Sequence, residues 1–152
     1  MYRKATMKDC KGVYDLICDL DCRELPYDSF SQIFAEQIAD SRFYCLICEE
    51  EGRLAGVLNL RFEGQLHHAC RVAEVMEFSV DASCRGRGIG KQMFAEACRI
   101  AQERGCSQIE LATNQLRTDA HRFYTREGMN NFHYKFSMPF DATGPMENII
   151  GR

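Results

Sequence analysis

Several kinds of sequence signal are absent from this chain. No window approaches eighteen apolar residues, and the opening Met1-Tyr-Arg-Lys leads into a polar stretch, so we expect neither a membrane span nor a secretion signal. A basic excess is also missing: 19 Lys and Arg stand against 22 Asp and Glu, which argues against a nucleic-acid partner. Since no repeat, linker or low-complexity segment is visible, we expect one domain over residues 1–152, with a loosely held tail after residue 139.

Cysteine, by contrast, is plentiful. The chain has nine cysteines, which are scattered and odd in number. Structural disulfides belong to oxidising compartments and consume cysteines in pairs. This usage therefore predicts free thiols that serve as small core residues in a cytoplasmic protein.

Apolar periodicity predicts an ordered series of strands and helices. The expected strands are residues 2–6, 43–48, 54–62, 72–80, 108–112 and 132–138. The expected helices are residues 8–25, 29–38, 91–104 and 118–127. The order β-α-α-β-β-β-α-β-α-β predicts an α/β protein in which helices cover both faces of a mixed sheet.

The most informative segment stands between an expected strand and an expected helix. It reads Val80-Asp-Ala-Ser-Cys-Arg85-Gly86-Arg87-Gly88-Ile89-Gly90-Lys91. Glycines let the backbone approach a ligand closely, and the free N–H groups of a first helical turn attract anions. Because Arg85, Arg87 and Lys91 add positive charge, the segment predicts a pyrophosphate site.

Two common phosphate-binding loops do not fit this segment. The P-loop requires Gly-x4-Gly-Lys-Ser/Thr, and no such string occurs. The dinucleotide fingerprint Gly-x-Gly-x-x-Gly, started at Gly86, would need a glycine where Lys91 stands.

The spacing Arg85-x-x-Gly88-x-Gly90 instead resembles the acetyl-CoA signature, Gln/Arg-x-x-Gly-x-Gly/Ala, of the GNAT family of N-acetyltransferases. A second segment, Asp119 to Met129, resembles the family's Ala-x-x-Phe-Tyr-x-x-x-Gly-Phe/Met helix ending. The likeness covers about residues 2 to 138. More narrowly, three stretches resemble bacterial aminoalkylphosphonate N-acetyltransferases: Tyr14 to Cys18, Leu66 to His68 and Asp119 to Gly128.

This resemblance implies the GNAT acyltransferase fold with acetyl-CoA as cosubstrate. The pyrophosphate is expected on the loop backbone, with Ile89 anchoring the loop in the core. The pantetheine arm is expected to enter a notch between two strand ends and to pair with the backbone around Ser79. Asn114 is a candidate donor to that arm, although asparagine is also a common turn residue. The expected cofactor-binding residues are Phe78, Ser79, Val80, Arg85, Gly86, Arg87, Gly88, Ile89, Gly90, Lys91 and Asn114.

Acetyl transfer to an amine needs a neutral amine and a proton for the departing thiolate. The resemblance gives the acid role to Tyr124, the alternative being a tyrosine at the edge of the core. Glu74 and Glu77 are the candidate bases, with Glu74 the first choice. Carboxylates on a central strand are costly to bury without a role or a partner, such as an ion pair with Arg61 or Arg71. Simple alternation would point the two glutamates to opposite faces, and a bulge, as in the resembled fold, would alter this.

The pair His67-His68 is open to three interpretations. The resembled phosphonate-modifying enzymes carry a histidine-rich stretch here, with a divalent metal implicated in their activity. Two histidines alone rarely hold zinc, so we expect no metal site and keep the pair as weak candidates. A contact to a substrate phosphonate and a plain surface turn are the alternatives.

The sequence therefore predicts a cytoplasmic, acetyl-CoA-dependent N-acetyltransferase. The expected acceptor is the primary amine of a small molecule, attacking directly, with an aminoalkylphosphonate as the leading example. Its anionic group would bind Arg23, Arg61 or Arg71. The alternatives are an aminoglycoside, polyamine or protein amine as acceptor, or a non-catalytic acyl-CoA sensor. The aromatic strand expected at 132–138 also predicts a homodimer through an exposed sheet edge, with no membrane or nucleic-acid partner.

Overall fold

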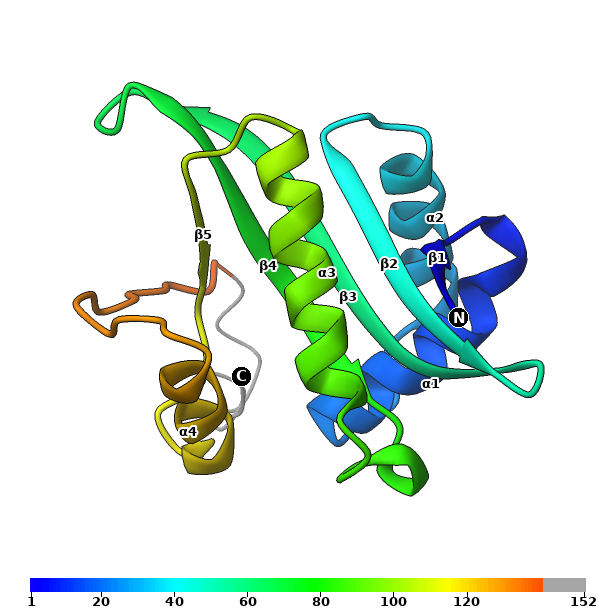
Figure 1. Ribbon diagram of the computed structural model, residues 1–152. Coiled ribbons are helices and arrows are strands. Elements are labelled where there is room, and N and C mark those ends of the chain that lie inside the picture. Colours follow the sequence, from blue (N-terminus) through cyan, green and yellow to red (C-terminus); the bar gives the residue numbers. More distant parts are fainter. Residues whose placement is uncertain (141–152) are drawn as a thin grey trace. The chain divides into compact units, whose positions relative to one another are not determined.

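The computed structural model describes residues 1–140 (Figure 1). Most of the tail expected to be loose, from residue 141 on, lies outside the described residues. The chain divides into two compact units, Met1–Leu111 and a second that begins at Ala112. Each unit is described by itself below.

The first unit is built on a five-stranded sheet with the strand order β1-β2-β3-β4-β5. The pairs from β1 to β4 are antiparallel, and β4 pairs with β5 in parallel, so the predicted mixed sheet is confirmed. The strands are β1 (Tyr2–Lys4), β2 (Phe43–Glu50), β3 (Arg53–Gln65), β4 (Cys70–Val80) and β5 (Gln108–Leu111).

Helices cover both faces of this sheet, as the element order predicted (Figure 1). Two short 3₁₀ turns, η1 (Met7–Asp9) and η2 (Ala82–Cys84), precede helices in the chain. Helices α1 and α2 pack on one face and α3 on the other. The bounds are α1 (Cys10–Asp21), α2 (Tyr27–Ile38) and α3 (Ile89–Glu103).

Alternate residues of β3 supply two separate cores. Val57 lies with α1 and α2, whereas Leu58 and Leu60 lie with α3, and all three are fully buried. Each such side chain contributes about 1.5–3 kcal/mol relative to an exposed one. A strand buried on both faces reads as a continuous apolar run, so the polar residue Asn59 inside this run needs an explanation.

The cysteines are free thiols, and four of them are buried. Cys45 and Cys48 have Cys-x-x-Cys spacing, but on a strand residues three apart face opposite sides. Cys45 accordingly packs under α1 and α2, and Cys48 under α3, so the pair cannot hold one zinc ion. Their use as small core residues is confirmed.

The second unit contains α4 (Thr118–Arg126), which ends before Gly128, as predicted. The strand predicted at 132–138 is wrong: no strand forms among residues 112–140. Its alternating aromatics are present, but Phe132, Tyr134 and Phe136 are all exposed. Alternation gives a segment the side-chain pattern of a strand, whereas a strand also needs a neighbouring backbone for its hydrogen bonds.

Candidate active site

The loop between β4 and α3 has the geometry of an anion cradle. Gly88 caps the N-terminus of α3 with φ of 80°, and Gly86 has φ of 77°. A side chain strongly disfavours this left-handed region, so glycine is required at both positions. No other heavy atom lies within 4 Å of where a Cβ would stand at either glycine, so the backbone borders open space.

The same loop is anchored and partly charged. Ile89, at the start of the 15-residue helix α3, is buried in the core under that helix, which confirms its predicted anchoring role. Arg85 Nε donates to the carbonyl oxygen of Val80 at 3.2 Å. Arg87 is paired with Glu50 at 3.0 Å, and Lys91 is exposed. The positive helix end, Arg85 and Lys91 are thus the charges at this loop that have no ion pair with a carboxylate among the described residues, whereas Arg87 has one.

Strand β4 leaves its neighbour β5 halfway along its length. The parallel ladder joins only Val72–Val75 of β4 to Gln108–Leu111 of β5. From Glu77 to Val80, β4 remains paired with β3 but has no strand on its other edge within residues 1–140. This stretch includes Phe78, Ser79 and Val80, where an extended ligand arm was predicted to pair with the backbone.

A bulge sets the direction of the two candidate bases. Leu60 lies opposite Val75 and Asn59 lies opposite Glu77, so Met76 is an extra residue on β4. Because one inserted residue reverses the alternation, Glu74 and Glu77 share the face on which α1 and α2 pack. Simple alternation would have separated them.

Glu77 is largely buried and accepts one hydrogen bond. The donor is Asn59 Nδ2, which lies 2.9 Å from Glu77 Oε2. Burial raises the pKa of Glu77, and the charges of Asp21 and Glu74 raise it further, while the Asn59 bond lowers it. A carboxylate with a raised pKa is a better proton acceptor than an ordinary glutamate, because Brønsted behaviour favours a pKa nearer the working pH.

Glu74 is held in an ion pair instead. Its Oε2 lies 2.6 Å from Arg61 Nη2, and the same nitrogen lies 3.1 Å from Glu63 Oε1. The sequence analysis gave an ion pair with Arg61 or Arg71 as the alternative to a catalytic role, and the pair with Arg61 is present.

The face that carries Glu77 is rich in carboxylates. Glu110 lies opposite Glu74 in the β4–β5 ladder and accepts from Gln65 at 3.1 Å. With Glu63, four glutamates of β3, β4 and β5 share this face, and Arg61 is the cation that pairs with two of them. Arg71 lies on the other face, where it donates to the carbonyl of Arg104.

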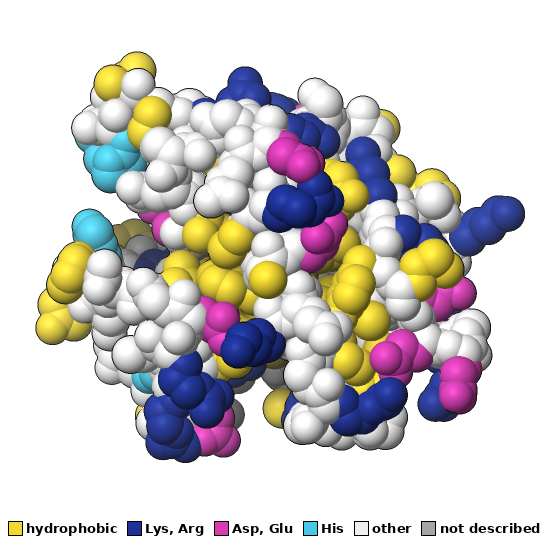
Figure 2. All heavy atoms as spheres, in the orientation of Figure 1, with side chains coloured by type: hydrophobic (Ala, Val, Ile, Leu, Met, Phe, Trp, Pro, Cys, Tyr) yellow, Lys and Arg dark blue, Asp and Glu magenta, His cyan; other side chains and the backbone are white. Residues whose placement is uncertain are grey.

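The histidine pair occupies the exposed tip of the β3–β4 hairpin (Figure 2). The rings of His67 and His68 are 4.1 Å apart, and His68 Nε2 lies 3.5 Å from Gln108 Nε2. Within residues 1–140, no group of three or more His, Cys, Asp or Glu side chains is arranged to hold a metal ion. The described residues around His67 and His68 therefore do not form a site for the divalent metal that the family resemblance suggested.

In the second unit, Asn114 shapes the turn before α4. Its Oδ1 accepts from the Leu116 N–H at 2.8 Å, and its carbonyl contacts His121 Nε2 at 2.8 Å. Asn114 thus stabilises a turn, which the sequence analysis had named as the alternative to binding the pantetheine arm.

Tyr124 lies on α4 with Phe123 packed edge-on at 5.4 Å between ring centroids. Desolvation raises the pKa of Tyr124, and Arg117 opposes this shift. A tyrosine phenol is protonated at neutral pH even at its ordinary pKa of about 10, and the raised pKa leaves it in this state, which a proton donor requires.

Sequence reasoning missed Asn59 and Gln37, which contact each other beside Glu77. A signal was available for the first, since Leu58-Asn59-Leu60 places an amide within an apolar strand. Nothing in the sequence marks Gln37, because a glutamine on a helix is ordinary.

Within residues 1–140, no helix is both long and apolar enough to cross a membrane.

An open glycine loop at a helix start, beside a strand edge without a partner strand among the described residues, is an arrangement that can hold an anionic cosubstrate with an extended arm. Comparison with known proteins gives the class of the protein. The sequence profile of the Acetyltransferase (GNAT) family matches residues 12–129. The chain belongs to this family, so it is an N-acetyltransferase that uses acetyl-CoA.

Individual relatives are consistent with this family. An aminoalkylphosphonate N-acetyltransferase from Salmonella typhimurium is 38% identical over 135 residues, 89% of this chain and 88% of that one. A protein named "Probable glucosamine 6-phosphate N-acetyltransferase 2" from Oryza sativa subsp. japonica is 30% identical over 115 residues, 70% of this chain and 69% of that one. A solved structure of a transcriptional regulator from Bacillus halodurans has 28% identity and a TM-score of 0.85, covering 92% of this chain and 99% of that one.

If the cradle binds acetyl-CoA, the same substitution at two glycines should have different effects on cosubstrate binding. Gly88→Asp places a side chain and a negative charge in the cradle, so acetyl-CoA should no longer raise the melting temperature. Gly52 has nearly the same backbone conformation, with φ of 75°, and the same open surroundings, but lies in the β2–β3 turn. Both variants should lose about 1–2 kcal/mol of stability from backbone strain. Only Gly52→Asp should retain the shift; a folded Gly88→Asp protein that retains it would contradict the assignment.

Proposed function

We propose that this chain transfers the acetyl group of acetyl-CoA to the primary amine of a small molecule that also carries a phosphonate or phosphate. The observation that carries the proposal is the 38% identity to an aminoalkylphosphonate N-acetyltransferase over 89% of the chain. The second relative's name also joins an amine to a phosphate, in glucosamine 6-phosphate. An aminoalkylphosphonate is the leading acceptor.

In the proposed mechanism the cofactor binds through backbone groups. The N–H groups of the first turn of α3 and the loop from Arg85 to Gly90 hold the pyrophosphate, with Lys91 adding charge. The pantetheine arm lies along Phe78 to Val80, where β4 has no partner strand within the described residues. The thioester is thereby held near the carboxylate of Glu77, which is on the same stretch of β4.

Glu77 is the proposed base. Free alkylamines have a pKa of about 10.4, so most of the acceptor arrives as an ammonium ion that cannot attack. Glu77 Oε2 is held by Asn59, and Oε1 accepts no hydrogen bond from the described residues. Oε1 is therefore the oxygen that receives the amine proton. Glu74 suits this role less well, because its carboxylate is committed to Arg61.

Tyr124 is the proposed acid. The amine attacks the thioester carbonyl carbon and the C–S bond breaks, which releases CoA thiolate. The phenolic proton of Tyr124 passes to that sulfur, and the second proton that the nitrogen loses on becoming an amide restores the phenol. The family resemblance of the helix ending around Phe123 and Tyr124 supports this assignment.

The charged side chains on the sheet face that carries Glu77 affect which class of amine acceptor is favoured. Of the three arginines considered for an anionic group, Arg61 shares this face and already pairs with Glu63 and Glu74. A phosphonate would compete with these carboxylates for the guanidinium. The excess of glutamates favours a second candidate, a polycationic amine such as a polyamine or aminoglycoside.

Three further expectations stay predictions from the sequence. These are a single acetyltransferase domain, a cytoplasmic location and a homodimer. The homodimer was argued from a final strand that does not form, so its remaining basis is the exposed aromatic residues of that segment.

An amine panel tests the acceptor class. Thiol release from acetyl-CoA should be measured with aminomethylphosphonate, 2-aminoethylphosphonate, glucosamine 6-phosphate, spermidine and an aminoglycoside. We expect an amine bearing phosphonate or phosphate to exceed the polycations in kcat/KM by more than tenfold. Preference for a polycation would replace the first candidate by the second and leave acetyl transfer in place.

The base assignment predicts different pH profiles for two glutamate variants. Glu77 must be ionised to accept a proton, and its pKa is raised, so activity should fall as the pH drops through that raised pKa. In Glu77→Gln, kcat/KM should fall by about 10²-fold or more and the acidic limb should flatten. Glu74→Gln is the control, since it should keep the limb. An unaltered limb in Glu77→Gln would remove Glu77 as the base.

The acid assignment predicts the effect of deleting one hydroxyl group. Tyr124→Phe should lower kcat by about 10²-fold or more with little change in the Kd of acetyl-CoA, because only the proton for the thiolate is lost. Tyr134→Phe is the matched control, since Tyr134 is 84% exposed. Wild-type kcat in Tyr124→Phe would exclude the assignment, and so would an equal loss in both variants.

A further inference from the structure

Asn59 is a buried amide in the middle of an apolar strand. Leu58 and Leu60 on either side are fully buried under α3, and Asn59 itself is 8% exposed on the opposite face. Burying an amide is costly unless its hydrogen bonds are made. The two hydrogens of Asn59 Nδ2 are satisfied, since one oxygen of Glu77 and one of Gln37 each lie 2.9 Å away. Asn59 Oδ1 is buried and has no hydrogen-bond partner among the described residues, so the site retains part of this cost.

We infer that Asn59 is a positioning residue, which fixes one carboxylate oxygen of Glu77 and leaves the other oxygen to the substrate amine. This inference rests on the proposed role of Glu77 as the base. Asn59 has no part in bond making, and its effect is exerted through Glu77.

The Glu77 carboxylate, which can only accept hydrogen bonds, determines which way the Asn59 amide points. Gln37 Oε1 accepts from the same Nδ2 that serves Glu77, so two acceptors from different elements converge on one nitrogen. With the amide reversed, Asn59 Oδ1 would face the Glu77 carboxylate, and two acceptors would repel each other. Through Asn59, the base on β4 is thus tied to helix α2.

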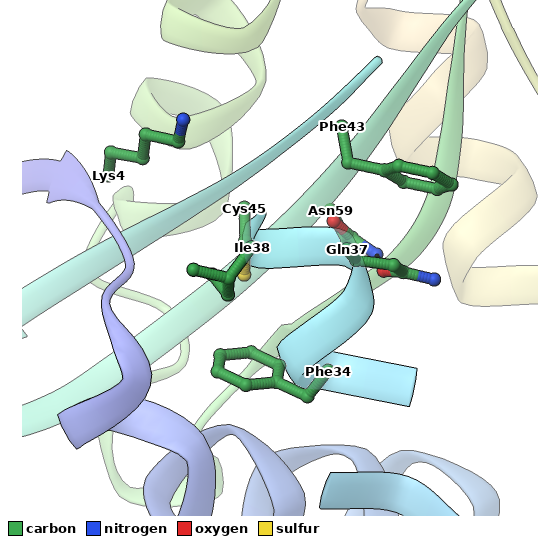
Figure 3. A pocket seen from close by; sticks show the side chains of 7 residues that line it. All are labelled: Lys4, Phe34, Gln37, Ile38, Phe43, Cys45 and Asn59. Carbon is green, nitrogen blue, oxygen red and sulfur yellow. Dashed lines mark hydrogen bonds between the residues drawn. The ribbon is translucent and has the colours of Figure 1, made fainter. Parts of the chain in front are cut away.

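The surroundings of Asn59 leave little room for water. A cavity of about 10 Å³ borders Asn59 and Gln37, with Phe34, Ile38 and Phe43 among its walls (Figure 3). This volume is at the lower limit for a single water molecule. A hydrogen bond to a charged group is stronger where water is scarce, and the Asn59 amide lies in such surroundings.

The other groups that face Glu77 all disfavour its ionised form. They are Glu74 on β4 and Asp21 at the end of α1. The Cys45 thiol on β2 stays neutral, because burial and the charge of Glu77 raise its pKa. Asn59 is the donor that lowers the pKa of Glu77 against them. Without Asn59, Glu77 would hold its proton to a higher pH, so a smaller fraction of the protein would carry the ionised carboxylate that can accept the amine proton.

A matched pair of substitutions separates this role from simple packing. Valine and threonine have nearly the same shape, but only threonine keeps a hydrogen-bond donor. Asn59→Val and Asn59→Thr should each be labelled with carbon-13 glutamate, and the carboxyl resonance of Glu77, assigned with Glu77→Gln, should be titrated by NMR. We expect the midpoint to rise by about one pH unit or more in Asn59→Val and to stay closer to wild type in Asn59→Thr.

The pH profile of kcat/KM provides the second measurement. Its acidic limb should move upward in Asn59→Val by the same amount as the NMR midpoint, with activity recovering at high pH. Equal midpoints in wild type and Asn59→Val, or equal shifts in both variants, would overturn the inference. If the NMR midpoint moves but the limb does not, Asn59 still positions Glu77 and the proposed base role of Glu77 fails instead.

Discussion

The arrangement of the site depends on one extra residue in β4. Met76 interrupts the pairing with β3 immediately after the last residue that pairs with β5. A bulge bends its strand and increases the local twist, which accounts for β4 leaving β5 at this point. The same insertion turns Glu77 to the face of Asn59 and Arg61. One irregularity thus coincides with the end of the β4–β5 pairing and turns the Glu77 carboxylate to the face on which α1 and α2 pack.

The two glutamates show how environment separates groups of the same type. Glu74 has a guanidinium partner, and the ion pair holds its carboxylate in place. Glu77 has an uncharged amide as its partner, and burial together with the charges of Asp21 and Glu74 raises its pKa. Desolvation and like charge are the two causes that make a glutamate a useful base near neutral pH. Glu74 was the first choice from the sequence because of its position in the resembled family. The partners and the burial of the two carboxylates could not be read from the sequence.

Much of the fold was predictable, because local signals determine it. Apolar periodicity located the four helices and five strands, and the glycine spacing located the cradle with Ile89 as its anchor. The bulge was not readable from the chain, since it is a property of the register between β3 and β4. The segment around Tyr134 failed for a related reason: alternation describes one strand, while pairing needs two. Asn59 was visible as a polar residue in an apolar run, but its partners Glu77 and Gln37 come from sequence-distant elements.

Direct attack by the amine, with no acetylated enzyme, is the central claim of this account. Nine cysteines, among them Cys84 beside the loop, offer alternative sites for a covalent intermediate. Intact-protein mass spectrometry after incubation with acetyl-CoA alone tests the claim most directly. The account predicts an unchanged protein mass until an amine is added, and then one acetylated amine for each thiol released. A protein that gains the mass of one acetyl group and passes it to the amine would contradict the account.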